Sequence, residues 1–250
     1  MSNKVAVVTG ASKGIGAATA MAFAKAGYEV VVNYREDDAA ADHLSNEVKK
    51  TGQRVLLVKA DAFSEKGIAK LFTTLKDQYS KIDVFVNNAG HAGEAAFGDY
   101  TIQEIDKTVM NIFGAMALCT QEAAKLMDRG SILFTSSIYG LPFGGNPKHA
   151  LYSASKAAVI NFAQTMAEQL GPNIRCNVVA PGTTKTPAWD SAKPEYVRKS
   201  LSMTLQGEWV DAEEIGNAFV FLAETPHMNA QTIVVDAGWQ KKIRDNHLMI

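Results

Sequence analysis

Short apolar runs alternate with longer amphipathic runs along the chain. Seven apolar runs are rich in Val and Ile and lack polar alternation, which indicates strands that are buried on both faces of a sheet. We expect these strands over residues 4–10, 29–34, 54–61, 82–90, 130–137, 174–182 and 232–238. The intervening runs predict helices over residues 14–27, 38–52, 65–79, 111–127, 151–164, 195–203 and 211–224.

The repeated strand–helix order predicts the fold class. Strands that alternate with helices form a parallel sheet with right-handed crossovers and helices on both faces. We therefore expect an α/β protein in which residues 1–250 form a single domain around one doubly wound parallel sheet, a Rossmann fold. No linker, repeat or low-complexity stretch divides the sequence.

Composition narrows the function classes. The 250 residues are 47% hydrophobic and 20% charged, with a formal net charge of −1. A chain with this near-neutral charge gives no sign of the clustered basic surface that nucleic-acid binding needs. No apolar run is long enough to span a bilayer. Cys119 and Cys176 fit a reducing compartment, although they could pair, and the N-terminus lacks a signal-peptide layout. We expect a cytoplasmic protein without a nucleic-acid, membrane or metal partner, since no ligand spacing for a metal occurs.

A glycine-rich motif, TGASKGIG, joins the first expected strand to the first expected helix. Glycines let a backbone turn tightly and approach a ligand closely, and a helix N-terminus favours an anion. The motif therefore predicts a pyrophosphate seat, although it could also be a turn that only permits tight packing. The residues expected at this seat are Gly10, Ser12, Lys13, Gly14, Ile15 and Gly16.

The end of the second expected strand bears on the choice of cofactor. In dinucleotide-binding folds an acid there holds the ribose 2′-hydroxyl, whereas an Arg accommodates a 2′-phosphate. The strand ends in Tyr34 and Arg35, and the first acid is Glu36. Arg35 and Lys13 could clamp a phosphate together, which favours NADP over NAD. Alternatively, Arg35 is only solvated, or Glu36 holds a hydroxyl.

Tyr152 and Lys156 lie four residues apart in an Ala-rich stretch that is expected to be helical. Positions i and i+4 share one face of a helix. A pair of this kind is common, so by itself it could be surface decoration.

In combination, the motifs resemble those of the short-chain dehydrogenase/reductase family over nearly the full chain. The matching pieces are TGASKGIG, Asp61, NNAG at 87–90, Asn111, the serine pair at 136–137, Tyr152 with Lys156, and PGTTKT at 181–186. The resemblance implies an enzyme that transfers hydride between a nicotinamide cofactor and a carbonyl or alcohol substrate. The nearest likeness is to the 3-oxoacyl-[acyl-carrier-protein] reductase and glucose dehydrogenase branches.

The resemblance also implies catalytic roles. Tyr152 would be the general acid in carbonyl reduction, Ser137 would polarise the carbonyl, and Asn111 would support Lys156 through a water. The interval from Ser137 to Tyr152 is about two residues longer than the family pattern, which leaves Ser136 as a weaker alternative to Ser137. Both serines could instead be ordinary strand-end hydrogen-bonding residues.

The pairing of a phenol with an amine has a physical rationale. Bringing a Tyr pKa from ~10 to ~7 requires about 4 kcal/mol of preference for the phenolate. A unit positive charge at ~4 Å supplies about that much at an effective dielectric of ~20. We therefore expect Lys156 to lower the pKa of Tyr152 toward working pH.

The same resemblance implies further cofactor contacts. Asp61 would approach the adenine, unless it only caps the strand end, and Lys156 would also hydrogen-bond the nicotinamide ribose. The remaining residues expected around the cofactor are Ala62, Asn88, Ala89, Gly90, Pro181, Gly182, Thr184 and Thr186.

Residues 187–210, approximately, are expected to form a substrate lid. A run that the two nearest branches share is altered here to Gln206-Gly207-Glu208-Trp209-Val210, which leaves the substrate open. The resemblance further implies a homotetramer in which the helices of Asn111 and Tyr152 form an interface. The alternative function is a catalytically silent NADP-binding sensor or scaffold, which would have no need to keep Asn111, Ser137, Tyr152 and Lys156 together. The role of the basic C-terminal tail, residues 241–250, stays open.

Overall fold

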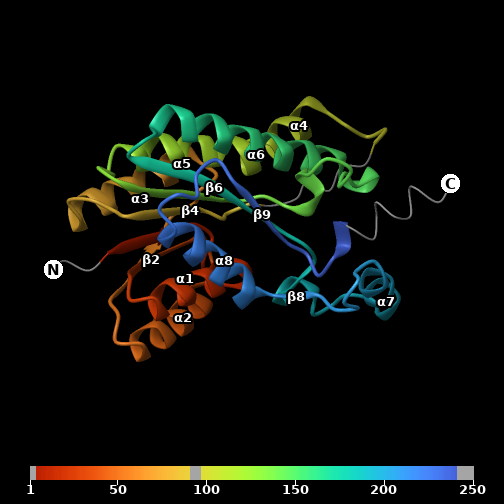
Figure 1. Cartoon of the computed structure of the whole chain (residues 1–250), viewed down its shortest axis with the longest axis horizontal. Helices are drawn as coiled ribbons and strands as arrows, with labels where there is room; N and C mark the ends of the chain where they lie inside the picture. The colour runs from red at the N-terminus through yellow and green to blue at the C-terminus, as the bar shows by residue number, and fades with distance from the viewer. Residues whose placement is uncertain (1–3, 91–96, 241–250) are drawn as a thin grey trace.

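Seven strands form one parallel sheet in the computed structural model, which describes residues 4–90 and 97–240 (Figure 1). Their order is β3-β2-β1-β4-β5-β6-β9, and every neighbouring pair is parallel. The strands are β1 (Val5–Val8), β2 (Glu29–Tyr34), β3 (Val55–Lys59), β4 (Val84–Asn87), β5 (Gly130–Thr135), β6 (Ile174–Pro181) and β9 (Thr232–Val235). The predicted Rossmann-type sheet is confirmed. The C-terminal tail lies outside the described residues.

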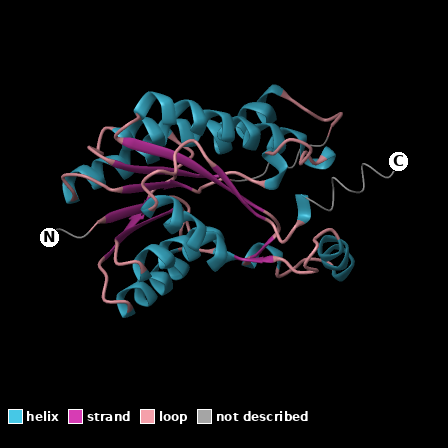
Figure 2. Cartoon of the chain, viewed as in Figure 1, coloured by secondary structure: helices cyan, strands magenta, loops and turns pink. Residues whose placement is uncertain are grey.

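Helices cover both faces of the sheet (Figures 1 and 2). One face carries α1 (Gly14–Lys25), α2 (Asp38–Lys50) and α8 (Ala212–Glu224), and the other carries α3 (Glu65–Gln78), α4 (Ile102–Val109), α5 (Ala115–Ala124) and α6 (Ala150–Leu170). Successive strand residues point to opposite faces, so Val5 and Val7 pack with one helical layer and Ala6 and Val8 with the other. This double burial explains the uniformly apolar strands.

Two helix boundaries differ from the prediction. The helix expected from Asn111 begins at Ile102 and contains a π-helical turn, Met110–Gly114, between α4 and α5. Thr101 caps its start, because its Oγ1 accepts a hydrogen bond from Glu104 N at 3.2 Å. The helix that carries Tyr152 continues to Leu170 rather than Gln164. No helix among the described residues is both long and apolar enough to cross a membrane.

A small second ladder frames the expected lid. β7 (Thr184–Lys185) pairs in parallel with β8 (Val210–Asp211). The chain between them, residues 186–209, contains α7 (Pro194–Ser202), which stands apart from the helices that cover the sheet (Figure 1). The two paired segments were not predicted, because two residues are too few to show a periodic pattern.

Candidate active site

A cleft of about 950 Å³ lies where the strands of the main sheet end. Its walls come from the turns after β1 to β6, and in open α/β sheets ligands bind beyond the carboxyl ends of the strands. The predicted site residues that line it are Gly10, Ser12, Lys13, Gly14, Ile15, Gly16, Tyr34, Arg35, Asp61, Ala62, Asn88, Ala89, Gly90, Ser137, Tyr152, Lys156, Pro181, Gly182 and Thr186. Residues far apart in the sequence therefore share one cavity.

Two predicted residues, Asn111 and Thr184, are not among the described residues that line the cleft. Thr184 belongs to β7, and its Oγ1 donates a hydrogen bond to Gly182 O at 3.0 Å. Asn111 lies in the π-helical turn, which packs against α6.

The glycine-rich turn fits a dinucleotide pyrophosphate. Gly10 has φ +62°, and a Cβ there would lie 3.0 Å from Ala89 Cα. A Cβ on Gly16 would lie 2.4 Å from Gly10 O, so this close approach requires glycine. No side chain caps the start of α1, and its first turn contains no acid. The free amides and the helix dipole therefore point at the cleft and favour an anion.

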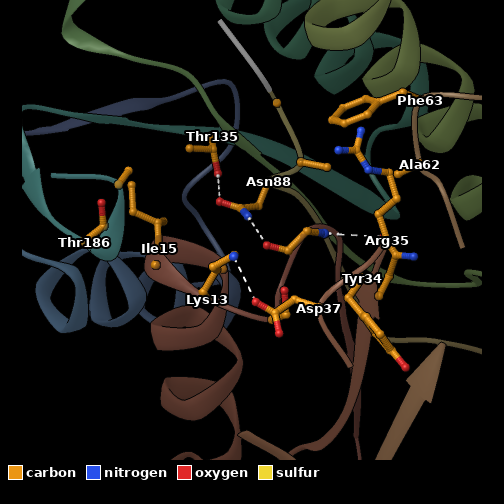
Figure 3. A pocket seen from close by; sticks show the side chains of 18 of the residues that line it. Lys13, Ile15, Tyr34, Arg35, Asp37, Ala62, Phe63, Asn88, Thr135 and Thr186 are labelled. Atoms are coloured by element: carbon orange, nitrogen blue, oxygen red, sulfur yellow. Dashed lines mark hydrogen bonds and ion pairs between the residues drawn. The ribbon is translucent and has the colours of Figure 1, made fainter. Parts of the chain in front are cut away.

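The cations expected to clamp a phosphate have carboxylate partners. Lys13 Nζ lies 3.0 Å from Asp37 Oδ2 (Figure 3). Arg35 Nε lies 2.8 Å from Glu36 Oε1. The pKa of Asp37 is lowered, first by a hydrogen bond from the backbone N–H of Ala40 and then by Lys13. All four side chains are substantially exposed, and exposed ion pairs contribute little to stability. The phosphate of an incoming cofactor can therefore replace the carboxylate partner of Lys13 or Arg35 at a small cost in free energy.

The neighbouring residues complete this end of the cleft. The Arg35 guanidinium lies 5.9 Å from the ring centre of Phe63, next to it in Figure 3. Tyr34 points its ring away from the cleft, and its hydroxyl donates to Asp38 Oδ1 at 2.9 Å. Asp61 Oδ1 accepts from Phe63 N at 3.0 Å, so this carboxylate caps its own turn.

Asn88 joins the ends of three strands rather than pointing at a ligand. Its Nδ2 donates to Thr9 O at 2.9 Å and to Gly10 O at 3.2 Å, and its Oδ1 accepts from Thr135 Oγ1 at 3.1 Å (Figure 3). The side chain therefore fixes the phosphate turn relative to β5. This leaves only the backbone of Asn88 to face the cleft.

Tyr152 and Lys156 lie on one face of α6 at the far end of the cleft. Lys156 is 3% exposed, its Nζ donates to Thr135 O at 2.7 Å, and it lies 5.7 Å from the ring centre of Tyr152. Burial lowers the pKa of Lys156 from 10.5 to about 7. Burial also raises the pKa of Tyr152, and a hydrogen bond from Ser137 opposes this rise. The expected lowering of the phenol pKa is therefore wrong for the protein alone, because burial disfavours both charged forms.

The two serines after β5 have different surroundings. Ser136 is 2% exposed, and its Oγ donates to Lys156 O at 2.8 Å. Ser137 hydrogen-bonds Tyr152, and its Oγ also accepts from Tyr139 N at 3.2 Å. Ser136 thus anchors α6, whereas the hydroxyl of Ser137 lies beside the phenol.

Several cleft residues were not singled out from the sequence. Some of them contribute mainly backbone, which carries no side-chain signature; Asp37 could have been found as the cap of the helix that follows Arg35. The further lining residues are Asn33, Asp37, Ala60, Phe63, Thr135, Pro187 and Ala188. No cluster of potential metal ligands occurs among residues 4–90 and 97–240.

Comparison with known proteins agrees with this geometry. A family described as enoyl-(acyl carrier protein) reductase matches residues 10–240. A 3-oxoacyl-[acyl-carrier-protein] reductase of Synechocystis sp. is 35% identical over 94% of this chain and 96% of that protein. A hydroxynaphthalene reductase-like protein of Metarhizium acridum is 32% identical over 95% of each chain.

A solved structure shares the architecture. A short-chain dehydrogenase from Burkholderia cenocepacia, in complex with NADP, superposes with a TM-score of 0.86. It is 29% identical, and the match covers 95% of this chain and 98% of that one. The sheet order, the cleft and these likenesses confirm the resemblance that the motifs indicated. The chain belongs to the short-chain dehydrogenase/reductase family of oxidoreductases.

Proposed function

We propose that this chain is an NADP(H)-dependent ketone reductase of the 3-oxoacyl type. One observation carries the proposal: Ser137, Tyr152 and Lys156 converge at one end of a cleft whose other end fits a dinucleotide pyrophosphate. The likeness to the Synechocystis reductase supports the substrate class.

Tyr152 is the general acid in this proposal. Its raised pKa keeps the phenol protonated near neutral pH, so it holds a proton for the carbonyl oxygen. The Ser137 hydroxyl donates a hydrogen bond to the same oxygen and stabilises its developing negative charge. The reduced nicotinamide, when bound, supplies the hydride that the carbonyl carbon accepts. The proton from Tyr152 completes the alcohol, and solvent reprotonates the phenolate.

Lys156 positions the reaction from the same helix. One of its N–H donors is used by Thr135 O, which leaves the rest of the amine to hydrogen-bond the nicotinamide ribose. Asn111 would support Lys156 through a water, from the π-helical turn that packs against α6. The neighbourhood thus fixes the amine, the phenol and Ser137 relative to one another.

The activity test follows the loss of reduced-nicotinamide absorbance with acetoacetyl-coenzyme A as substrate. We expect turnover with NADPH that exceeds turnover with NADH. Tight NADPH binding without turnover on this thioester or on a panel of simple ketones would contradict the proposal.

The choice of NADP rests on the charges at the adenosine end. Arg35→Ala should raise KM for NADPH about tenfold or more while changing KM for NADH little, because only NADPH carries the phosphate. Arg129→Ala is the matched control, since Arg129 precedes the amino end of β5, whereas the cleft lies beyond the carboxyl ends of the strands. Equal effects of Arg35→Ala on both cofactors would show that Arg35 does not read the phosphate.

A further inference from the structure

Tyr152 stands at one end of a row of aromatic side chains. The ring centre of Tyr139 lies 6.4 Å from that of Tyr152 and 5.8 Å from that of Trp239, in edge-to-face arrangements. Tyr196, on α7, lies near enough to Tyr139 that charge repulsion between the two phenolates adds to the effect of burial, and both raise the pKa of Tyr196. We call Tyr139, Tyr196 and Trp239 the aromatic wall.

Tyr139 is held rigidly beside the catalytic residues. It lies in the 3₁₀ turn Ile138–Gly140, which packs against α6. A Cβ on Gly140 would lie 2.6 Å from the carbonyl carbon of Lys156, so the turn and the helix are in close contact. Tyr139 N also donates to Ser137 Oγ. The ring therefore keeps its position relative to both Ser137 and Tyr152.

The other two members come from distant segments that are also fixed. The carboxylate of Asp236 accepts hydrogen bonds from Gly238 N at 2.9 Å and Gln240 N at 2.8 Å, and these bonds flank Trp239. Trp239 is 7% exposed. Tyr196 stacks on Trp189 with a ring-centre distance of 5.2 Å and an interplanar angle of 15°. The aromatic wall is thus organised before a substrate enters.

A carbonyl that reaches the Tyr152 hydroxyl lies close to Tyr139, the member of the aromatic wall whose ring is next to that of Tyr152. Aromatic rings pack favourably edge-to-face or offset against other rings, whereas a saturated ring lacks the π-system that this packing uses. A fixed wall also binds a rigid, flat molecule without the entropy loss that ordering a flexible chain requires. We propose that the aromatic wall selects ketones that carry a planar aromatic ring, and this inference rests on the reductase function proposed above.

The test compares β-tetralone with β-decalone, which share a two-ring skeleton and differ in the aromatic ring. With NADPH, kcat/KM for β-tetralone should exceed that for β-decalone by about tenfold, the size expected from ring packing. Tyr139→Leu and Trp239→Leu should each reduce this ratio, mainly through KM, and Tyr139→Phe should keep it. Phe221→Leu is the matched control, because Phe221 is an exposed aromatic residue on α8.

The outcomes separate the two proposals. Turnover of both ketones at similar kcat/KM would overturn the aromatic-wall inference and leave the reductase function standing. Turnover of neither ketone nor acetoacetyl-coenzyme A would overturn the reductase function. In that case, calorimetry compares the affinities of the protein for β-naphthol and decahydro-β-naphthol, which tests selection by the aromatic wall without turnover. Equal affinities would contradict the aromatic-wall inference. The wild-type ratio decides the question even if a Leu variant fails to fold.

Discussion

Lys156 is an ionisable amine whose burial costs stability. Burial lowers its pKa from 10.5 to about 7, so between these values the unfolded chain binds a proton that the folded chain does not. The stability contributed by this site is therefore lowest at and below neutral pH and rises as pH increases toward 10.5. The fold holds the amine in place despite this cost, which is consistent with a functional rather than a structural role.

Lys156→Met should accordingly stabilise the protein alone. We expect the free energy of unfolding to rise by about 2 kcal/mol near neutral pH, since relief of the buried charge exceeds the lost hydrogen bond to Thr135 O. Urea unfolding across a pH series measures this gain, which should shrink as pH approaches 10.5. Lys66→Met, at an exposed position of α3, is the control and should show no such trend. A loss of stability at every pH would refute the assignment.

Tyr152→Phe tests the proton donor. Removing the hydroxyl should lower kcat by about 100-fold or more, the range for loss of a general acid, while NADPH affinity stays nearly unchanged. Steady-state kinetics and cofactor titration measure the two effects. Tyr100→Phe, outside the described cleft, should leave both unchanged. Near-normal turnover by Tyr152→Phe would show that another group gives the proton.

The phosphate turn makes a prediction about an element rather than a side chain. Gly16→Ala should drive its methyl group into Gly10 O and open the turn, because a Cβ there lies 2.4 Å from that oxygen. We expect KM for NADPH to rise by about tenfold or more, since the backbone amides that would bind the pyrophosphate would lose their arrangement. Kinetics and differential scanning calorimetry separate the loss of binding from the loss of stability.

Gly27→Ala provides the contrast. Gly27 has φ +90°, but a Cβ added there would meet no heavy atom within 4 Å, so only backbone strain results. This variant should lose about 1 kcal/mol of stability and keep its KM for NADPH. If both variants changed KM alike, close packing at Gly16 would not explain the motif.

The elements that could be predicted are those whose burial leaves a clear pattern. The strands of the sheet are mainly apolar and lack polar alternation, and all seven were located from that feature. The start of α4 was missed although Ile102, Ile105 and Val109 follow helical spacing, because the segment is short and largely exposed. Its signal was present in Thr101 and Glu104, three residues apart, as in a helix cap.

The cleft also has features that could be predicted from the sequence and features that could not. Side chains with distinctive chemistry, such as Tyr152 with Lys156, could be placed from the sequence. The hydrogen bond from Lys156 to Thr135 O could not, because a backbone carbonyl has no residue-type signature. The degree of burial was also inaccessible, and burial decides the direction of both pKa shifts. The sequence therefore indicated which groups meet but not their charge states.

At the scale of the whole molecule, apolar side chains remain exposed along α4 and the π-helical turn. Ile102 is 74% exposed and Met110 is 46% exposed, on the face of the sheet that also carries α6 (Figure 1). Exposed apolar patches of this kind mark association surfaces. This supports the proposed homotetramer, in which the helices of Asn111 and Tyr152 form an interface.

Light scattering of the full chain tests that assembly. We expect the mass of four copies for the wild type and of smaller species for Ile102→Asp, because a buried carboxylate opposes association. Ala69→Asp, on the exposed side of α3, should leave the mass unchanged. A monomeric wild type would contradict the proposal.

The ladder between β7 and β8 has a consequence for the segment that it encloses. Thr184 pairs with Val210, Lys185 pairs with Asp211, and an ion pair of 3.0 Å joins the second couple. The segment 186–209 therefore begins and ends at neighbouring points, because the strands at its two ends pair with each other. Because its two ends are held together, this segment can be shortened, lengthened or exchanged for that of a relative without moving β7 or β8. Transplanting the segment from a relative as one unit should therefore leave the sheet intact, and the substrate range of the chimera would test the proposed role of residues 186–209 as a substrate lid.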